Sequence, residues 1–380
     1  MRSLKSRFLA VCVAATLAAL LGLAGCGKFF PPLTKGGGGT GSSSGNYLYI
    51  GNIGTNPLTI AGFSIAGSAL TSVSGSNWSV ALEPTALAVT PDDSYLYLGS
   101  AAGSIYVYTI GSNGAITLAN GGTPVATGVS PSVLRVDSTG KWLLGASSFS
   151  GEAFVFQIGT GGVLTPLSSS VVTLNGSVPS TDLEIAPNDD YVYVSCSTAG
   201  IYTLSFNSDT GALAQVNTVL VPKSANAADY GLAISPSGNF LFAAETVTGG
   251  VRVFSIGTNG TLTETAGSPY TTGTGAWSVL VDSTGSYVYV ANRTQGNISG
   301  FVLSNNGALT AIPGSPFPTG SLPVAMVEDK SETYLAVVNS GGSPDLQVFT
   351  INTTTGALTS LATEKTGTDP TEASSIAATH

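Results

Sequence analysis

Histidine is almost absent from this chain: the 380 residues include one, His380, at the last position. A catalytic triad needs an internal histidine, and histidine is the commonest metal ligand, so both kinds of site are nearly excluded. The 3 cysteines, Cys12, Cys26 and Cys196, are too few for a disulfide framework. We therefore expect no metal, no cofactor and no disulfide scaffold.

Charge is also scarce. Charged residues make up 9% of the chain, against about 25% in typical proteins, which argues against a coiled coil or a solenoid of charged helices. The 12 Lys and Arg residues face 21 Asp and Glu residues. A nucleic-acid-binding protein needs a basic face, so this class is excluded. Hydrophobic residues reach 43%, enough for a large buried core.

What the sequence has in abundance is glycine, 49 residues, together with β-branched and aromatic residues, which favour short strands and tight turns. One aromatic, alternating segment recurs every 47 to 49 residues. Its copies are Tyr47–Ile50, Tyr95–Leu98, Trp142–Leu144, Tyr191–Val194, Phe240–Phe242, Tyr287–Val290 and Tyr334–Val337. This period indicates seven copies of one structural unit.

Each unit contains three further strand-like segments, exemplified by Ile105–Ile110, by the Gly-x-Leu-Thr-like segment Gly114–Thr117, and by Ser132–Asp137 before the next aromatic segment. Four short strands per unit of about 48 residues are typical of a β-propeller. The sequence therefore predicts an all-β, seven-bladed propeller of four antiparallel strands per blade over residues 46–380. A stacked β-solenoid is the alternative, but its repeats are usually shorter.

The two ends of the repeat region are complementary. The first unit lacks a strand before Tyr47, whereas one spare strand, residues 370–379, follows the last unit. We predict that this strand completes the first blade and closes the ring, which would pair both exposed edges. His380 is then expected to be a frayed, solvated terminus.

The N-terminal segment has the features of a signal peptide over residues 1–25. A basic stretch, Met1–Arg7, precedes an apolar run, Phe8–Leu23, that is shorter than a membrane-spanning helix. The end of this run, Leu23-Ala24-Gly25-Cys26, resembles a bacterial lipobox, which implies cleavage before Cys26 and lipidation of its thiol. Ordinary secretory cleavage beside an incidental cysteine is the alternative.

Residues 26–45 would then form a lipidated cysteine and a Gly/Ser-rich tether with a reach of about 24 Å. Cleavage leaves 9 cations and 21 anions, a net charge of −12. We expect a monomeric, extracytoplasmic lipoprotein held to the membrane through Cys26, in the outer membrane of a Gram-negative host because Gly27 rather than Asp follows the cysteine. Cys196 lies in a strand-like run and is expected to be buried.

Three segments carry a family resemblance: Tyr289–Asn292, Gly296–Phe301 and Gly314–Gly320. They resemble the lactonase-type seven-bladed propellers and the related YVTN propellers over roughly residues 46–380. This resemblance implies a 6-phosphogluconolactonase-like activity, the hydrolysis of a sugar lactone, or a relation to muconate-lactonising enzymes. The Gly-His and Trp-Asp pairs of WD-repeat propellers are absent.

The resemblance also implies where a catalytic site would lie. Enzymes of this family carry a Pro-Arg-His segment on one inner strand and a Glu after the next strand. The first aligns here with Asp229–Leu232, which has neither Arg nor His, and the Glu is retained as Glu245. If the chain is an enzyme, we expect Glu245 to be the base and Arg135 or Arg293 to polarise the carbonyl.

Counting back from each aromatic segment locates residues that face the central channel. Most are small or apolar, but Arg135, Asp182 and Glu184 are charged and lie in adjacent units. Arg135 and Glu184 occupy equivalent positions, which predicts an ion pair, either purely structural or facing a ligand.

The expected inner strands also begin with aromatic residues. Tyr230 and Trp277 could form a rim with Glu245 and Arg293 that binds sugars or peptides, although aromatic residues at these positions can also simply pack the blade tops.

Two classes of function remain open from the sequence. One is a binding or interaction module whose central funnel takes a cell-envelope glycan, peptide or protein. The alternative is a lactone hydrolase of the kind that the family resemblance implies. Fold alone does not choose between them, and whether the chain is an enzyme is left open here.

Replacing Cys26 with Ser should release the protein from the membrane, because the acyl chains contribute roughly 0.8 kcal/mol of membrane affinity per buried CH₂ group. Cell fractionation followed by immunoblotting measures this directly. Cys196→Ser is the matched control and should remain in the membrane pellet. Retention of the Cys26→Ser protein in the pellet would contradict acyl anchoring.

Overall fold

A computed structural model of the chain describes residues 45–54, 57–147, 149–174, 179–216, 220, 227–247, 250–367 and 372–380. The predicted signal peptide, the lipidation site Cys26 and nearly all of the predicted tether lie outside the described residues. Among the residues described, no helix has the length and apolarity needed to cross a membrane.

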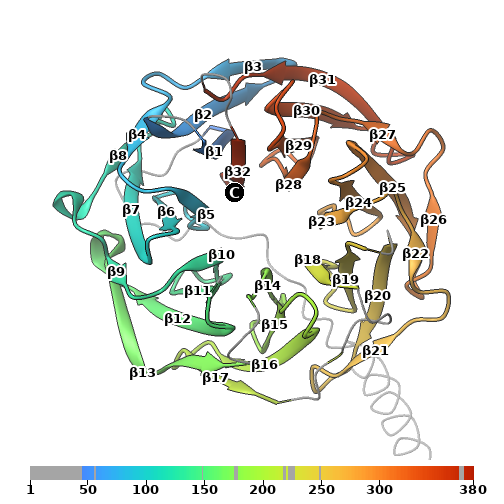
Figure 1. Ribbon diagram of the computed structural model, residues 1–380, viewed down its shortest axis with the longest axis horizontal. Helices are drawn as coiled ribbons and strands as arrows, with labels where there is room; N and C mark the ends of the chain where they lie inside the picture. Colours follow the sequence, from blue (N-terminus) through green and yellow to red (C-terminus); the bar gives the residue numbers. More distant parts are fainter. Residues whose placement is uncertain are drawn as a thin grey trace, which may run out of the picture. The chain divides into compact units, whose positions relative to one another are not determined.

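Seven antiparallel sheets are arranged around a central axis, and each is one blade of a β-propeller (Figure 1). We number the blades from the one that contains the first strand. Blades 2 to 7 each use four consecutive strands, ordered from the axis outward as they occur in the chain. The predicted fold class is therefore confirmed.

The strand bounds follow the predicted period. The innermost strands of blades 1 to 7 are β32 (Glu372–Ala378), β5 (Pro84–Val89), β10 (Pro131–Val136), β14 (Asp182–Ile185), β18 (Asp229–Ile234), β23 (Ala276–Val281) and β28 (Pro323–Glu328). The second strands are β1 (Tyr47–Ile53), β6 (Tyr95–Ser100), β11 (Trp142–Ser147), β15 (Tyr191–Ser195), β19 (Phe240–Glu245), β24 (Tyr287–Asn292) and β29 (Tyr334–Asn339).

The outer half of each blade is more variable in length. The third strands are β2 (Leu58–Ala66), β7 (Ser104–Ile110), β12 (Glu152–Ile158), β16 (Ile201–Asn207), β20 (Gly250–Ile256), β25 (Asn297–Leu303) and β30 (Leu346–Ile351). The outermost are β3 (Ala69–Ser72), β8 (Ile116–Leu118), β13 (Leu164–Thr173), β17 (Ala212–Gln215), β21 (Leu262–Glu264), β26 (Leu309–Ala311) and β31 (Leu358–Glu364). Short strands β4 (Trp78–Val80), β9 (Ala126–Thr127), β22 (Tyr270–Thr271) and β27 (Phe317–Pro318) pair with the third strands, and two 3₁₀ turns span Asn120–Gly122 and Thr160–Gly162.

The buried core lies between blades rather than within them. The described residues form seven hydrophobic clusters, and each draws its members from two adjacent blades. A single four-stranded blade leaves two faces exposed, so each blade needs both neighbours to bury its apolar surface. Cys196 is part of the cluster between blades 3 and 4 and is fully buried, as predicted.

The recurring aromatic segment connects neighbouring blades by a repeated hydrogen bond. The hydroxyl of Tyr49 in β1 donates to the carbonyl of Gly114 in blade 2, at 2.8 Å. Tyr97, Tyr193 and Tyr289 make the same bond to the next blade, with carbonyl oxygens of Gly162, Gly260 and Gly356 at 2.7 to 3.1 Å. Each hydroxyl is satisfied inside the core, where an unpaired one would be costly.

The acceptor glycine of this bond cannot be replaced freely. Gly114 has a φ of 77°, which favours glycine, and a Cβ there would lie 2.4 Å from the ring of Tyr47. Gly356 occupies the equivalent position in blade 7: its φ is 72°, and a Cβ there would lie 2.3 Å from the ring of Tyr287. The Gly-x-Leu-Thr repeat in the sequence therefore follows from close packing of one blade against the turn of the next.

The ring is closed as the complementary ends predicted. β32 pairs antiparallel with β1 in blade 1, and Figure 1 shows the C-terminus at the centre of the ring beside it. The backbone N–H of Thr379 continues this ladder by donating to Tyr47 O at 3.0 Å. The serine hydroxyl of Ser374 donates at 2.9 Å to Pro84 O, which joins blade 1 to blade 2.

His380 is not frayed, in contrast to the expectation from sequence. Its backbone N–H donates to the Asp93 carboxylate in blade 2 at 2.7 Å. Lys330, from blade 7, forms an ion pair with the other oxygen of Asp93, also at 2.7 Å. Asp93 therefore receives a bond from each of the two blades that precede it in the ring, which fixes the C-terminal residue, two positions beyond β32.

Deleting residues 372–380 should destabilise the whole propeller, because it removes β32, which closes the ring, and with it Ala373 and Ala378 of one inter-blade cluster and Ala377 of another. We expect the free energy of unfolding to fall by more than about 4 kcal/mol, measured by urea denaturation. Removal of His380 alone is the control; it keeps β32 and should cost about 1 kcal/mol. A truncated chain that unfolds like the full one would contradict closure.

Candidate functional site

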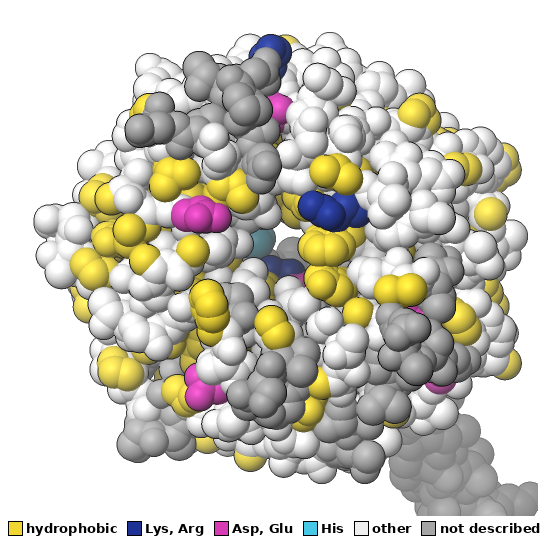
Figure 2. Space-filling view, viewed as in Figure 1, with side chains coloured by type: hydrophobic (Ala, Val, Ile, Leu, Met, Phe, Trp, Pro, Cys, Tyr) yellow, Lys and Arg dark blue, Asp and Glu magenta, His cyan; other side chains and the backbone are white. Residues whose placement is uncertain are grey.

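A cavity of about 620 Å³ lies at the centre of the ring. All seven inner strands contribute to its wall, and Figure 2 shows the opening from one face, with charged side chains inside it. A cavity of this volume is in the range of small-molecule sites.

A repeated irregularity of the inner strands supplies many of the lining side chains. In six blades the pairing of the inner strand shifts by a bulge near its start. A bulge adds an unpaired residue and redirects its side chain. The residues at these bulges all line the cavity: Thr85, Ser132, Tyr230, Gly231, Trp277, Val324 and Ser374.

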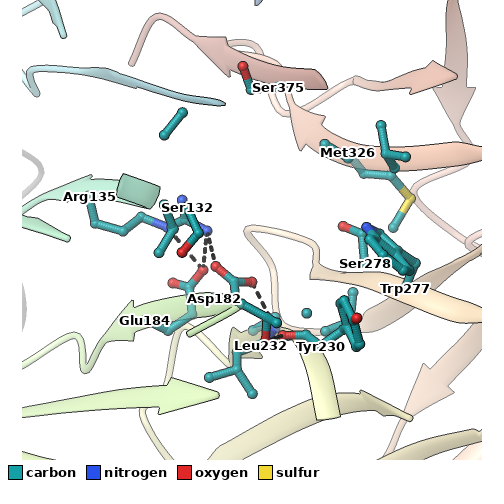
Figure 3. Close-up of a pocket in the computed structure, with 18 of the residues that line it drawn as sticks. Ser132, Arg135, Asp182, Glu184, Tyr230, Leu232, Trp277, Ser278, Met326 and Ser375 are labelled. Carbon is teal, nitrogen blue, oxygen red and sulfur yellow. Dashed lines mark hydrogen bonds and ion pairs between the residues drawn. The ribbon is translucent and has the colours of Figure 1, made fainter. Parts of the chain in front are cut away.

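Three charged side chains meet in the cavity (Figure 3). Arg135 of β10 contacts Glu184 of β14 through two nitrogens, with Nη2 to Oε1 at 2.7 Å and Nε to Oε1 at 3.1 Å. The ion pair that the sequence predicted is therefore present. Arg135 Nη2 also reaches Asp182 Oδ1, at 3.2 Å.

The two carboxylates have different surroundings. Asp182 Oδ1 accepts a backbone N–H from Leu183 at 2.8 Å, and Oδ2 accepts one from Leu232 of the next blade at 2.9 Å. Both oxygens of Asp182 are thus held by the framework. The hydrogen bonds to Glu184 fall on Oε1 alone, which leaves Oε2 without a hydrogen bond from any described residue.

The three side chains remain accessible through the cavity, with exposed fractions of 37% for Arg135, 17% for Asp182 and 22% for Glu184. Partial burial raises the pKa of Glu184 above its ordinary value, and the Arg135 charge opposes this rise while the Asp182 charge adds to it. One cation facing two carboxylates gives the group a net charge of −1. Glu184 is therefore a better proton acceptor than an exposed glutamate.

An aromatic pair lines the cavity beside this charged group. This pair is on the two blades that follow Glu184 in the ring: the rings of Tyr230 in β18 and Trp277 in β23 are 4.2 Å apart at their centroids, and the Arg293 guanidinium lies 4.7 Å from the Trp277 ring centroid. The backbone carbonyl of Tyr230 accepts hydroxyl bonds from Ser195 at 2.6 Å and Thr181 at 3.1 Å. The structure thus brings together three of the four residues of the predicted rim.

Glu245 does not join this rim. It is 1% exposed and is absent from the residues that line the cavity. It lies opposite Asp229 in the β18–β19 pair, and Asp229 forms an ion pair with Arg252 at 3.1 Å. Arg252 also contacts Glu264, at 3.3 Å. The glutamate that aligned with the family's catalytic position therefore lies in a buried charge cluster of blade 5.

The sequence analysis missed several polar residues of the cavity. Ser132 and Ser278 line it, and the hydroxyls of Thr181 and Ser195 position Tyr230. A bulge brings Ser132 into the wall and Ser278 directly follows the bulge at Trp277, and a bulge leaves no clear signal in a sequence with so many small residues. No cluster of three or more His, Cys, Asp or Glu residues suited to a metal occurs in the described part of the chain.

These features define a propeller with a central, polar, small-molecule-sized cavity. A family model described as "Lactonase, 7-bladed beta-propeller" matches residues 48–187, 191–312 and 264–374. The chain therefore belongs to the seven-bladed β-propeller lactonase family. No curated protein sequence matches it significantly.

Solved structures share the fold. A protein from Lactobacillus plantarum has a TM-score of 0.72 and 21% identity, covering 88% of this chain and 99% of its own. A candidate 6-phosphogluconolactonase from Bacteroides uniformis has a TM-score of 0.72 and 20% identity, and the match also covers 88% of this chain and 99% of the other. The periplasmic gluconolactonase of Pseudomonas aeruginosa has a TM-score of 0.74 and 16% identity, and the match covers 88% of this chain and 99% of the gluconolactonase. At sequence identities this low, the similarity shows a shared fold alone.

The buried cluster of blade 5 should make stability depend on pH. Burial raises the pKa of Asp229 to about 7, although Arg252 opposes the rise. The folded chain then holds a proton between about pH 4 and pH 7 that the unfolded chain releases, so the contribution of Asp229 to stability falls as pH rises.

We expect Asp229→Asn to flatten this dependence by up to about 1.4 kcal/mol per pH unit, measured by urea unfolding across that range. Asp209→Asn, in an exposed turn, is the control and should leave the slope unchanged. An unaltered slope in Asp229→Asn would show that this carboxylate is ionised throughout.

Proposed function

We propose that this protein hydrolyses a sugar lactone in its central cavity, with Glu184 as the base and Arg135 as the group that polarises the carbonyl. The observation that carries this proposal is the pair itself: a carboxylate with one unused oxygen beside a guanidinium, in the open cavity of a lactonase-family propeller. Membership of the lactonase family favours hydrolysis over the binding-module interpretation.

The proposed reaction needs only water. Glu184 Oε2 takes a proton from a water molecule, and the oxygen of that water molecule attacks the lactone carbonyl carbon. The bond between that carbon and the ring oxygen then breaks, and the ring oxygen receives the proton from Glu184. The product is a hydroxy acid, and Glu184 is returned to its ionised form.

Arg135 is suited to the second role by its geometry. Four of its five N–H groups are engaged: three toward Glu184 and Asp182, and one from Nη1 toward the Leu134 carbonyl at 3.2 Å. The remaining Nη1 hydrogen is available to a carbonyl oxygen in the cavity. A donor that is held in place before the reaction stabilises the developing oxyanion without reorganisation.

Asp182 has a supporting role in this proposal. It contacts Nη2 of Arg135, as Glu184 also does, and is itself anchored to the backbone of blade 5 through Leu232. Its negative charge also raises the pKa of Glu184. A base whose pKa lies closer to neutral is more effective at physiological pH.

A non-catalytic binding module is the second candidate. The observation that favours it is the inner strand of blade 5, where Asp229–Leu232 aligns with the Pro-Arg-His segment of the family's enzymes and has neither Arg nor His. The cavity would then bind an envelope glycan, a peptide or a protein. In either case we propose an extracytoplasmic location, which the Pseudomonas aeruginosa periplasmic gluconolactonase also has.

Turnover of glucono-1,5-lactone, corrected for spontaneous hydrolysis, tests the proposal. Glu184→Gln should lower kcat at least about 100-fold, because a general base typically accelerates a reaction by a factor of about 10²–10⁴. Glu83→Gln, an exposed glutamate, is the control for removing one charge and should retain activity. Glu245→Gln should also retain kcat, since Glu245 does not line the cavity.

Three outcomes would contradict the proposal. Equal activity in wild type and Glu184→Gln would place catalysis elsewhere, and loss only in Glu245→Gln would restore the role inferred from the alignment. Absence of any turnover in wild type, with sugar binding to the cavity, would favour the binding module.

A further inference from the structure

The charge of the cavity constrains the kind of sugar that it takes. Arg135 is the only cation among the described residues that line it, and it faces the carboxylates of Asp182 and Glu184. The cavity therefore carries a net charge of −1, and its guanidinium is already occupied by two anions. The protein as a whole is also acidic, with a formal charge of −9.

We propose that the substrate is an uncharged sugar lactone and that the cavity discriminates against phosphorylated lactones. This inference rests on the proposed function. A phosphate group brings up to two negative charges, and a site that binds one usually offers several cationic or backbone N–H donors. Here it would meet a carboxylate pair instead, in a partly desolvated space where like charges repel strongly.

The remaining walls suit an uncharged sugar. The rings of Tyr230 and Trp277 line the same cavity as the carboxylates and offer an apolar surface for the C–H groups of a sugar ring (Figure 3). Sugar hydroxyls can donate to Glu184 Oε2, and the Ser132 and Ser278 hydroxyls are also in the lining. Aromatic surface together with a few placed polar groups is the usual composition of a small-molecule site.

The same charge would help the product to leave. Opening of a neutral lactone creates a carboxylate where none existed before. The substrate enters without repulsion, and the product is repelled by Asp182 and Glu184 once it ionises. A phosphorylated substrate would experience this repulsion already on entry.

Arg293 is the residue most able to oppose this inference. Its guanidinium lies over the Trp277 ring at 4.7 Å, but Arg293 is not among the residues that line the cavity. It could hold an anionic substituent only at the rim, beyond the aromatic pair. Its role is therefore tested separately by Arg293→Met.

The experiment compares kcat/KM for glucono-1,5-lactone and its 6-phosphate on the purified wild-type protein. We expect the uncharged lactone to be preferred at least tenfold. Ser278→Lys places a cation in the cavity and should shift the ratio at least fivefold toward the phosphorylated lactone. Ser278→Met has a similar length without the charge and should not shift it, and Arg293→Met should change the ratio less than twofold.

An equal or greater kcat/KM for the 6-phosphate in wild type would overturn the inference while leaving the proposed function intact, and loss of that activity in Arg293→Met would locate the phosphate at the rim. If neither lactone is turned over, the proposed function fails and the inference is tested by calorimetry with glucose and glucose 6-phosphate. Binding of glucose but not of glucose 6-phosphate would support discrimination against the phosphate group. Binding of glucose 6-phosphate, or of neither sugar, would overturn it.

Discussion

The burial of each blade between two neighbours is the constraint on which the rest of this structure depends. The core is divided into clusters that adjacent blades share, and buried tyrosines such as Tyr49 and Tyr289 donate to the turn of the next blade. A blade by itself cannot bury its apolar faces or satisfy these hydroxyls. The only arrangement that satisfies every blade is a closed ring, which is why β32 returns to pair with β1.

Closure also creates the cavity. Seven inner strands around one axis cannot all fill the centre with side chains, and the bulges at their starts turn residues such as Ser132 and Trp277 into the space that remains. The blades repeat at a nearly constant interval in the sequence, so residues at equivalent positions of adjacent blades lie at the same level along the ring axis. Arg135 and Glu184 are 49 residues apart in the sequence, yet their side chains are in contact.

Within the family fold, this chain uses blade 5 in a different way from the enzymes that it resembles. The strand that aligns with their Arg and His carries Tyr230, and the aligned glutamate, Glu245, is buried beside Asp229 and Arg252. Blade 5 thus contributes a buried charge cluster and one wall of the cavity. The groups with chemistry to offer are on the inner strands of blades 3 and 4, which is where the proposed lactone hydrolysis and the preference for uncharged sugars are located.

The sequence by itself determined the number of blades, the place of each strand, the ring closure and the Arg135–Glu184 pair, because each of these follows from a period that repeats along the chain. Only the tertiary structure decided which further side chains enter the cavity. A bulge shifts the register of a strand without a distinct residue pattern, so neither Ser132 nor Ser278, which follows the bulge at Trp277, was foreseen. Alignment likewise assigned Glu245 a position in the chain but not its surroundings, which are set by strands far apart in the sequence that pack around it in the folded ring.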